Sequence, residues 1–91
     1  MKVKNLQGTA NRTPPRSYSS WLDYYMRQRR LSSTPQCAAC GCSHSAEVGA
    51  HVIKAGSPDR SWHIVPLCSR CNMRDDEFEV KSSTPPLPVY P

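Results

Sequence analysis

Two Cys-x-x-Cys pairs constrain this chain more than any other feature of its sequence. The first pair is Cys37 and Cys40, the second is Cys68 and Cys71, and 27 residues separate the two pairs. Two residues between cysteines allow both thiolates to face one ion at about 2.3 Å, and two such pairs complete a tetrahedron. Because four thiolates leave no coordination position open, the spacing predicts one structural zinc ion that takes no part in catalysis.

A fifth cysteine, Cys42, follows the first pair after one glycine. The Cys40-Gly41-Cys42 segment is too cramped to reproduce the geometry of a Cys-x-x-Cys pair easily. We therefore expect Cys42 to be a small, buried or half-exposed residue. The alternative is that Cys42 replaces Cys40 as a ligand.

The short length of the chain favours a metal staple. Its 91 residues include 9 prolines and only 37% hydrophobic residues, and a chain of this size buries little apolar surface. No signal peptide is visible, and no run approaches the roughly 18 apolar residues that span a bilayer. We expect a soluble, cytoplasmic protein without a membrane role, in which reduced cysteines bind metal and do not form disulfides.

The positive charge is concentrated in the first third of the chain. Residues 1–30 carry seven basic side chains and one acidic one, whereas residues 31–91 carry five basic and six acidic ones. The resulting charges are +6 and −1, which together give the net charge of +5. This asymmetry predicts a contact with nucleic acid. A tail that only keeps the protein soluble is the alternative.

Four segments are expected along the chain. Residues 1–17 lack periodicity and read as a flexible basic arm. Residues 18–31 predict an amphipathic helix, with Ser20 as N-cap and Asp23 three positions later. Residues 36–81 hold the cysteines, and residues 82–91 form a Pro-rich tail that favours extended, polyproline-like structure.

The cysteine module predicts two strands and a helix. Residues 48–53 and 62–67 read as the strands of a hairpin, and the second cysteine pair opens a helix that extends to about Asp76. A brief strand over residues 78–80 follows. The order of knuckle, hairpin and helix predicts a small α+β zinc-stabilised domain, a treble-clef finger that the amphipathic helix precedes.

Within this module, two short motifs resemble the HNH endonuclease (His-Me finger) superfamily. The motifs are Ala50-His51-Val52 and the stretch from His63 to Asn72, which contains Pro-Leu-Cys-x-x-Cys-Asn. The resemblance covers residues 37–74. It implies that His51 is the general base that activates water, and that Asn72 ligates a second divalent metal ion. It also places His63 where the family usually has an asparagine that steadies the base.

One departure from the family pattern concerns the second ion. The family usually has Asp or His before the base as a metal ligand, but this chain has Ala50. A hard cation prefers at least one carboxylate, which Asp75 or Asp76 would have to supply, unless His63 binds a softer metal. Without the family context, His51 would be interpreted as a hydrogen-bonded structural residue.

Six arginines are candidates for contacts with phosphate groups. They lie on the amphipathic helix, beside the hairpin and in the last helix: Arg27, Arg29, Arg30, Arg60, Arg70 and Arg74. On the opposite face of the first helix, Trp21 and Tyr25 are expected to dock on the zinc module and enlarge its core.

Three functions are therefore compatible with the sequence. The first is an HNH-type endonuclease that cuts nucleic acid, with DNA favoured as substrate. The second is a non-catalytic HNH-like finger that binds nucleic acid, and the third is an adaptor that binds a protein partner. The basic arm favours the first two over the third, and Ala50 favours the second over the first.

Overall fold

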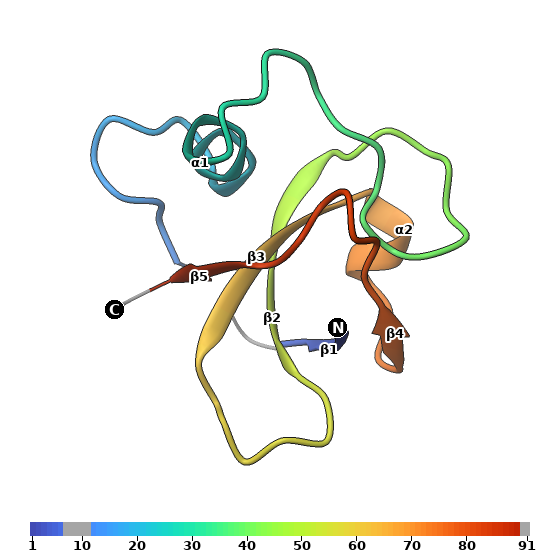
Figure 1. Cartoon of the computed structure of the whole chain (residues 1–91). Coiled ribbons are helices and arrows are strands. Elements are labelled where there is room, and N and C mark those ends of the chain that lie inside the picture. The colour runs from blue at the N-terminus through green and yellow to red at the C-terminus, as the bar shows by residue number, and fades with distance from the viewer. Residues whose placement is uncertain (7–11, 90–91) are drawn as a thin grey trace.

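The computed structural model describes residues 1–6 and 12–89, which form a small α+β protein built on one antiparallel sheet (Figure 1). The strands are β1 (Lys2–Asn5), β2 (Val48–Lys54), β3 (Trp62–Leu67), β4 (Glu77–Glu79) and β5 (Leu87–Val89), in the spatial order β4-β1-β2-β3-β5. The helices are α1 (Trp21–Gln28) and α2 (Ser69–Asn72). Within the described ranges, neither helix has the length and apolar character needed to cross a membrane.

The expected hairpin is confirmed as β2 and β3. Its register places His51 opposite Ile64, and Val52 opposite His63. Because side chains alternate along a strand and paired residues share a face, His51 and His63 point to opposite sides of the sheet. Figure 1 shows this hairpin between α1 and α2.

The N-terminal residues differ from the expected flexible arm. Residues 2–5 form β1, which pairs with β2 on one side and β4 on the other. Val3 is fully buried there. The alternation of charged and apolar residues in Lys-Val-Lys-Asn suits a strand, but four residues are too few to reveal it without the distant partners. Residues 7–11 of the expected arm lie outside the described residues.

The Pro-rich tail is likewise part of the sheet. Residues 87–89 form β5, which pairs with β3 at the edge, a position where proline is tolerated. The Tyr25 hydroxyl donates a hydrogen bond of 2.7 Å to the Pro85 carbonyl. The tail is thereby attached to both the hairpin and α1.

The first helix begins as expected and ends early. The Ser20 hydroxyl accepts a hydrogen bond of 2.9 Å from the Asp23 amide, which confirms the N-cap. The helix ends at Gln28 and not at Leu31, and Arg30 adopts a positive φ of 57°. Tyr25 packs into a buried cluster with Ile64 and Val89, so α1 covers one face of the sheet.

The second helix is also shorter than expected, and ends at Asn72 rather than near Asp76. The chain must reverse after α2 because β4 begins at Glu77 and pairs with β1. The pairing continues beyond β4, where the Val80 amide donates to the Met1 carbonyl. The pairing of β4 with β1 therefore limits the length of α2.

Gly49 permits the close approach of α1 to β2. A Cβ at this position would lie 2.4 Å from the Trp21 carbonyl carbon and 2.5 Å from the Leu22 amide nitrogen. Both of these are backbone atoms, which cannot move aside as a flexible side chain would. The start of α1 therefore lies against β2 only because residue 49 lacks a side chain.

We expect Gly49→Ala to destabilise the protein by about 2 kcal/mol, the typical cost of overpacking. For a domain of this size, the melting temperature should fall by roughly 10 °C. Thermal unfolding followed by circular dichroism measures this, with the exposed Ser83 changed to alanine as control. An unchanged melting temperature for Gly49→Ala would contradict the close approach of helix and strand.

The face of the sheet opposite α1 holds the larger core. Val3, Val52, Val65 and Phe78 are buried in it together with cysteine side chains. The cysteines therefore extend the hydrophobic core, and the fold places α1 and the cysteine cluster on opposite faces of the sheet.

Candidate metal centre and histidine cleft

Four cysteine side chains gather at one point beneath the sheet: Cys37, Cys42, Cys68 and Cys71. Their sulfur atoms all lie within 4.8 Å of one another, and the Sγ atoms of Cys42 and Cys68 are 3.8 Å apart. A tetrahedron of thiolates bonded at about 2.3 Å has edges of about 3.8 Å. The cluster therefore has the ligand number and spacing needed to hold one metal ion.

This set differs from the expected one because Cys42 takes the place of Cys40. Residues 39–42 form a tight turn in which the Cys42 amide donates to the Ala39 carbonyl at 3.1 Å. Gly41 stands at the third position with a φ of 87°, which favours glycine. Cys40 stands at the outer corner of this turn and is exposed, whereas Cys42 lies after the turn and beside Cys68.

Local structure shifts the pKa values of three thiols of the cluster: Cys37, Cys68 and Cys71. Cys68 is the N-cap of α2, and the Cys71 amide donates to its sulfur, which lowers the pKa of Cys68. Burial raises the pKa of Cys37 and raises that of Cys71 to about 12. A buried thiolate requires a compensating positive charge, which a bound metal cation would supply.

A separate cleft of about 350 Å³ opens beside the first half of β2. Strand β1 pairs with residues 52–54 of β2, and the Leu6 amide next to it donates a hydrogen bond of 3.0 Å to the His51 carbonyl. Among the described residues, no further strand pairs with residues 48–50 on that side. The cleft is lined by Arg12, Pro14, Ser20, Trp21, Leu22, Glu47, Val48, Gly49, Ala50, His51 and Asn72. His51 and Asn72, which are 21 positions apart in the sequence, therefore line the same cleft.

His51 is held in the cleft by two tryptophans. Its ring packs edge to face against Trp21 at 4.8 Å and against Trp62 at 6.0 Å. His51 is 6% exposed, and its Nε2 atom has no hydrogen-bond partner among the described residues. Burial, and then the positive charge of Arg12, lower the pKa of His51 below 6.5. The imidazole is therefore neutral at pH 7, with an unused nitrogen.

Glu47 supplies the carboxylate of the cleft. Its Oε1 atom accepts a hydrogen bond of 2.9 Å from the Ser69 amide, which ties the start of β2 to α2. Asp75 and Asp76, expected to supply a carboxylate, do not line the cleft. Asp76 instead forms an ion pair with Arg74 at 2.6 Å. Glu47 is thus the one carboxylate that lines the cleft among residues 1–6 and 12–89.

Ala50 is 3% exposed and packs in the core on the face opposite His51. The side chain of residue 50 points away from His51 because neighbouring residues of a strand alternate in direction. A longer side chain at this position would enter the core. The packing of this sheet therefore leaves room for alanine at position 50 but not for a larger metal-binding side chain.

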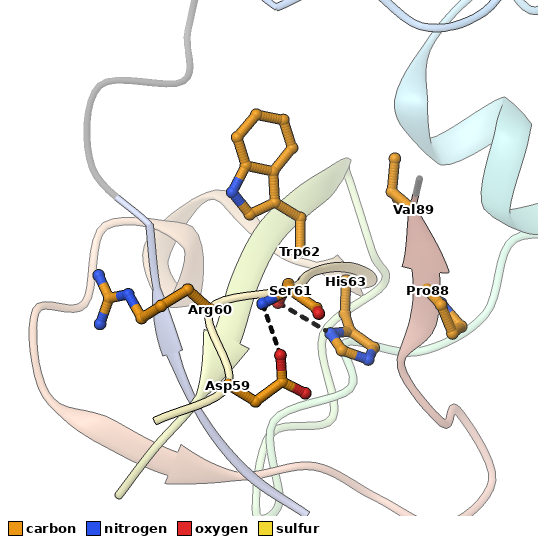
Figure 2. A pocket seen from close by; sticks show the side chains of 7 residues that line it. All are labelled: Asp59, Arg60, Ser61, Trp62, His63, Pro88 and Val89. Atoms are coloured by element: carbon orange, nitrogen blue, oxygen red, sulfur yellow. Dashed lines mark hydrogen bonds between the residues drawn. The ribbon is translucent and has the colours of Figure 1, made fainter. Parts of the chain in front are cut away.

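His63 does not join His51 and Asn72. It lines a different pocket with Asp59, Arg60, Ser61, Trp62, Pro88 and Val89. Its Nδ1 atom lies 3.3 Å from the Ser61 carbonyl. Figure 2 shows the rings of His63 and Trp62 on opposite sides of β3. The structure thus separates the expected catalytic group into two sites.

The six candidate arginines divide into two groups of three. Arg27 contacts Asp23 and Tyr18, Arg29 donates to the Pro86 carbonyl, and Arg74 pairs with Asp76. The side chains of the other three form no hydrogen bond or ion pair with another described residue: Arg30, Arg60 and Arg70. Sequence analysis did not identify Arg12 or Glu47 as site residues, because neither belongs to a recognisable motif.

Comparisons of the chain with protein-family models, with curated protein sequences and with solved structures found no match. The resemblance to HNH endonucleases therefore depends on the motif residues alone.

Proposed function

We propose that the protein is a zinc-stabilised, HNH-like nuclease that hydrolyses phosphodiesters in nucleic acid, with DNA as the favoured substrate. One observation carries the proposal: His51 and Asn72, the two positions that the family resemblance singles out, line the same cleft. The cleft lies at the protein surface on the edge of β2, where a polynucleotide backbone can reach it.

In this proposal zinc is the ion in the cysteine cluster. Zinc prefers four sulfur ligands in a tetrahedron, and the spacing of the four thiols fits that geometry. The knuckle at residues 37–42, the β2–β3 hairpin and α2 would then form a treble-clef finger. The closed coordination sphere gives this zinc a structural role, since it leaves no position for a substrate.

His51 would act as the general base. Its neutral imidazole has a buried Nε2 atom with no hydrogen-bond partner among the described residues. A water molecule that enters the cleft and reaches this atom would lose a proton to it as the water attacks phosphorus. The surrounding tryptophans hold the ring in one orientation.

A second divalent cation would be held by the side-chain carbonyl of Asn72 and the carboxylate of Glu47. Bound there, such an ion would supply positive charge to stabilise the leaving oxygen. The Glu47 carboxylate would take the place of the Asp or His ligand that the family usually has at position 50. The Ser69 amide orients it by holding one of its oxygens.

A plasmid-nicking assay with purified, zinc-loaded protein tests this function. Magnesium, manganese, nickel or additional zinc should support conversion of supercoiled DNA to the open circle, and changing both Glu47 and Asn72 to alanine should remove the activity. Absence of nicking with every metal at high protein concentration would contradict the proposed hydrolysis.

A non-catalytic nucleic-acid-binding finger is the second candidate. It is favoured by the single carboxylate of the cleft, one oxygen of which is already engaged by Ser69. In this case the protein binds DNA without cutting it, and its affinity falls steeply as salt increases. Fluorescence anisotropy with a labelled duplex distinguishes the candidates, and the absence of both nicking and binding would favour a protein partner.

A further inference from the structure

Arg12 is fixed at the mouth of the histidine cleft by two aromatic residues. Its guanidinium carbon lies 3.4 Å from the ring centroid of Trp62. Its carbonyl accepts a hydrogen bond of 3.3 Å from the indole Nε1 of Trp21. These are the same two tryptophans that pack against His51. Arg12 and His51 are therefore positioned by a common aromatic frame.

The charge of Arg12 has no counter-ion among the described residues. The ion pairs among the described residues involve four other cations: Met1, Arg27, Lys54 and Arg74. Glu47, the acidic residue that lines the cleft, is hydrogen-bonded to Ser69. Glu47 keeps its negative charge, but no carboxylate among the described residues forms an ion pair with the Arg12 guanidinium at the mouth of the cleft.

The way in which Arg12 is held leaves its hydrogen-bond donors available. Stacking on Trp62 uses the flat face of the guanidinium, whereas its N–H groups lie in the plane and point outward. A planar fork of this kind binds a phosphate group through two parallel hydrogen bonds. An arginine that stacks on an indole is therefore preorganised for an anionic, two-oxygen ligand.

We propose that Arg12 is the phosphate-binding residue of the histidine cleft and donates two hydrogen bonds to the non-bridging oxygens of a nucleic-acid phosphodiester beside His51. This proposal rests on the proposed function, namely that the cleft receives nucleic acid. It extends that function because the family resemblance covers residues 37–74 only and assigns no role to Arg12. The positive charge also opposes protonation of His51, so one side chain serves both the ligand and the base.

The test compares Arg12→Gln with Arg16→Gln. Both variants remove one positive charge from the same segment, but Arg16 is exposed and does not line the cleft. Zinc-loaded proteins are titrated with a fluorescein-labelled DNA duplex at several salt concentrations, without added divalent metal or chelator. For Arg12→Gln we expect affinity to fall about tenfold and the salt slope to fall by about one. Arg16→Gln should lose less than about threefold in affinity, because it removes only long-range charge.

A third variant, Arg12→Lys, keeps the charge but loses the planar fork. It should retain the salt slope of the wild-type protein while binding DNA more weakly. Equal losses for Arg12→Gln and Arg16→Gln would overturn the proposal, since they would reflect general charge. A wild-type protein that binds no DNA would instead overturn the proposed function itself, and the wild-type titration alone shows this.

A measurement on the wild-type protein covers the case in which Arg12→Gln does not fold. The side-chain Nε–H signal of Arg12 is assigned in the nitrogen–proton NMR spectrum by its loss in Arg12→Lys. We expect this signal to shift when the DNA duplex is added, because a phosphate hydrogen bond changes the environment of that proton. An unchanged Arg12 signal at saturating DNA would overturn the proposal.

Discussion

Replacement of Cys42 by serine should abolish tight zinc binding and unfold the protein, whereas Cys40→Ser should leave both unchanged. Cys42 belongs to the cluster of four sulfurs, and Cys40 is exposed at the corner of the preceding turn. In zinc-finger peptides a structural zinc contributes about 10–16 kcal/mol of apparent binding free energy. The whole stability of a native domain is about 5–15 kcal/mol, so loss of one ligand threatens the fold.

The two substitutions form a matched pair, because they exchange the same atoms two residues apart. Zinc content per chain and far-ultraviolet circular dichroism are measured for the wild-type protein and for each variant. Excess EDTA should unfold the wild-type protein, and Cys40→Ser should respond to EDTA in the same way. The opposite result, in which Cys40→Ser loses zinc and Cys42→Ser keeps it, would show that the Cys-x-x-Cys spacing determines the ligands.

The second large effect is expected at His51. If His51 is the general base, His51→Ala should reduce the rate of plasmid nicking by about 10²–10⁴-fold, the usual contribution of such a base. DNA affinity should remain close to that of the wild-type protein, because a neutral imidazole contributes no charge to phosphate binding. His44→Ala is the control, since His44 is exposed and does not line the cleft. Equal nicking by His51→Ala and His44→Ala would remove His51 from the mechanism.

The same histidine determines the expected pH dependence. Because burial and Arg12 lower the pKa of His51 below 6.5, the neutral base is already formed at neutral pH. The nicking rate should therefore be constant near pH 7 and decline on the acidic side with an apparent pKa below 6.5. Stability should follow the same direction: the unfolded chain binds the proton more readily, so stability falls as pH drops below about 6.5. In Arg12→Gln the pKa of His51 should rise, so the nicking rate should begin to decline at a higher pH than in the wild-type protein.

Several features of the fold could be predicted from local sequence alone. The N-cap at Ser20 follows from a serine with an acidic residue three positions later, and the structure confirms it. The β2–β3 hairpin follows from two apolar, β-branched segments separated by a loop with glycine and proline, and it is also confirmed. Three of the four clustered cysteines could also be predicted, because the Cys-x-x-Cys pairs are visible in the local sequence.

The remaining features depend on partners that are distant in the sequence. Strands β1 and β5 are short, and each becomes a strand only because the hairpin presents a free edge to it. A single turn at Gly41 decides between Cys40 and Cys42, and the position of that turn depends on contacts with residues 66 and 79–81. The cysteine spacing therefore determined that this chain carries thiols suited to hold a metal ion. Only the tertiary structure decided which thiols converge, and which arginine lies beside His51, because these choices follow from packing across the sheet.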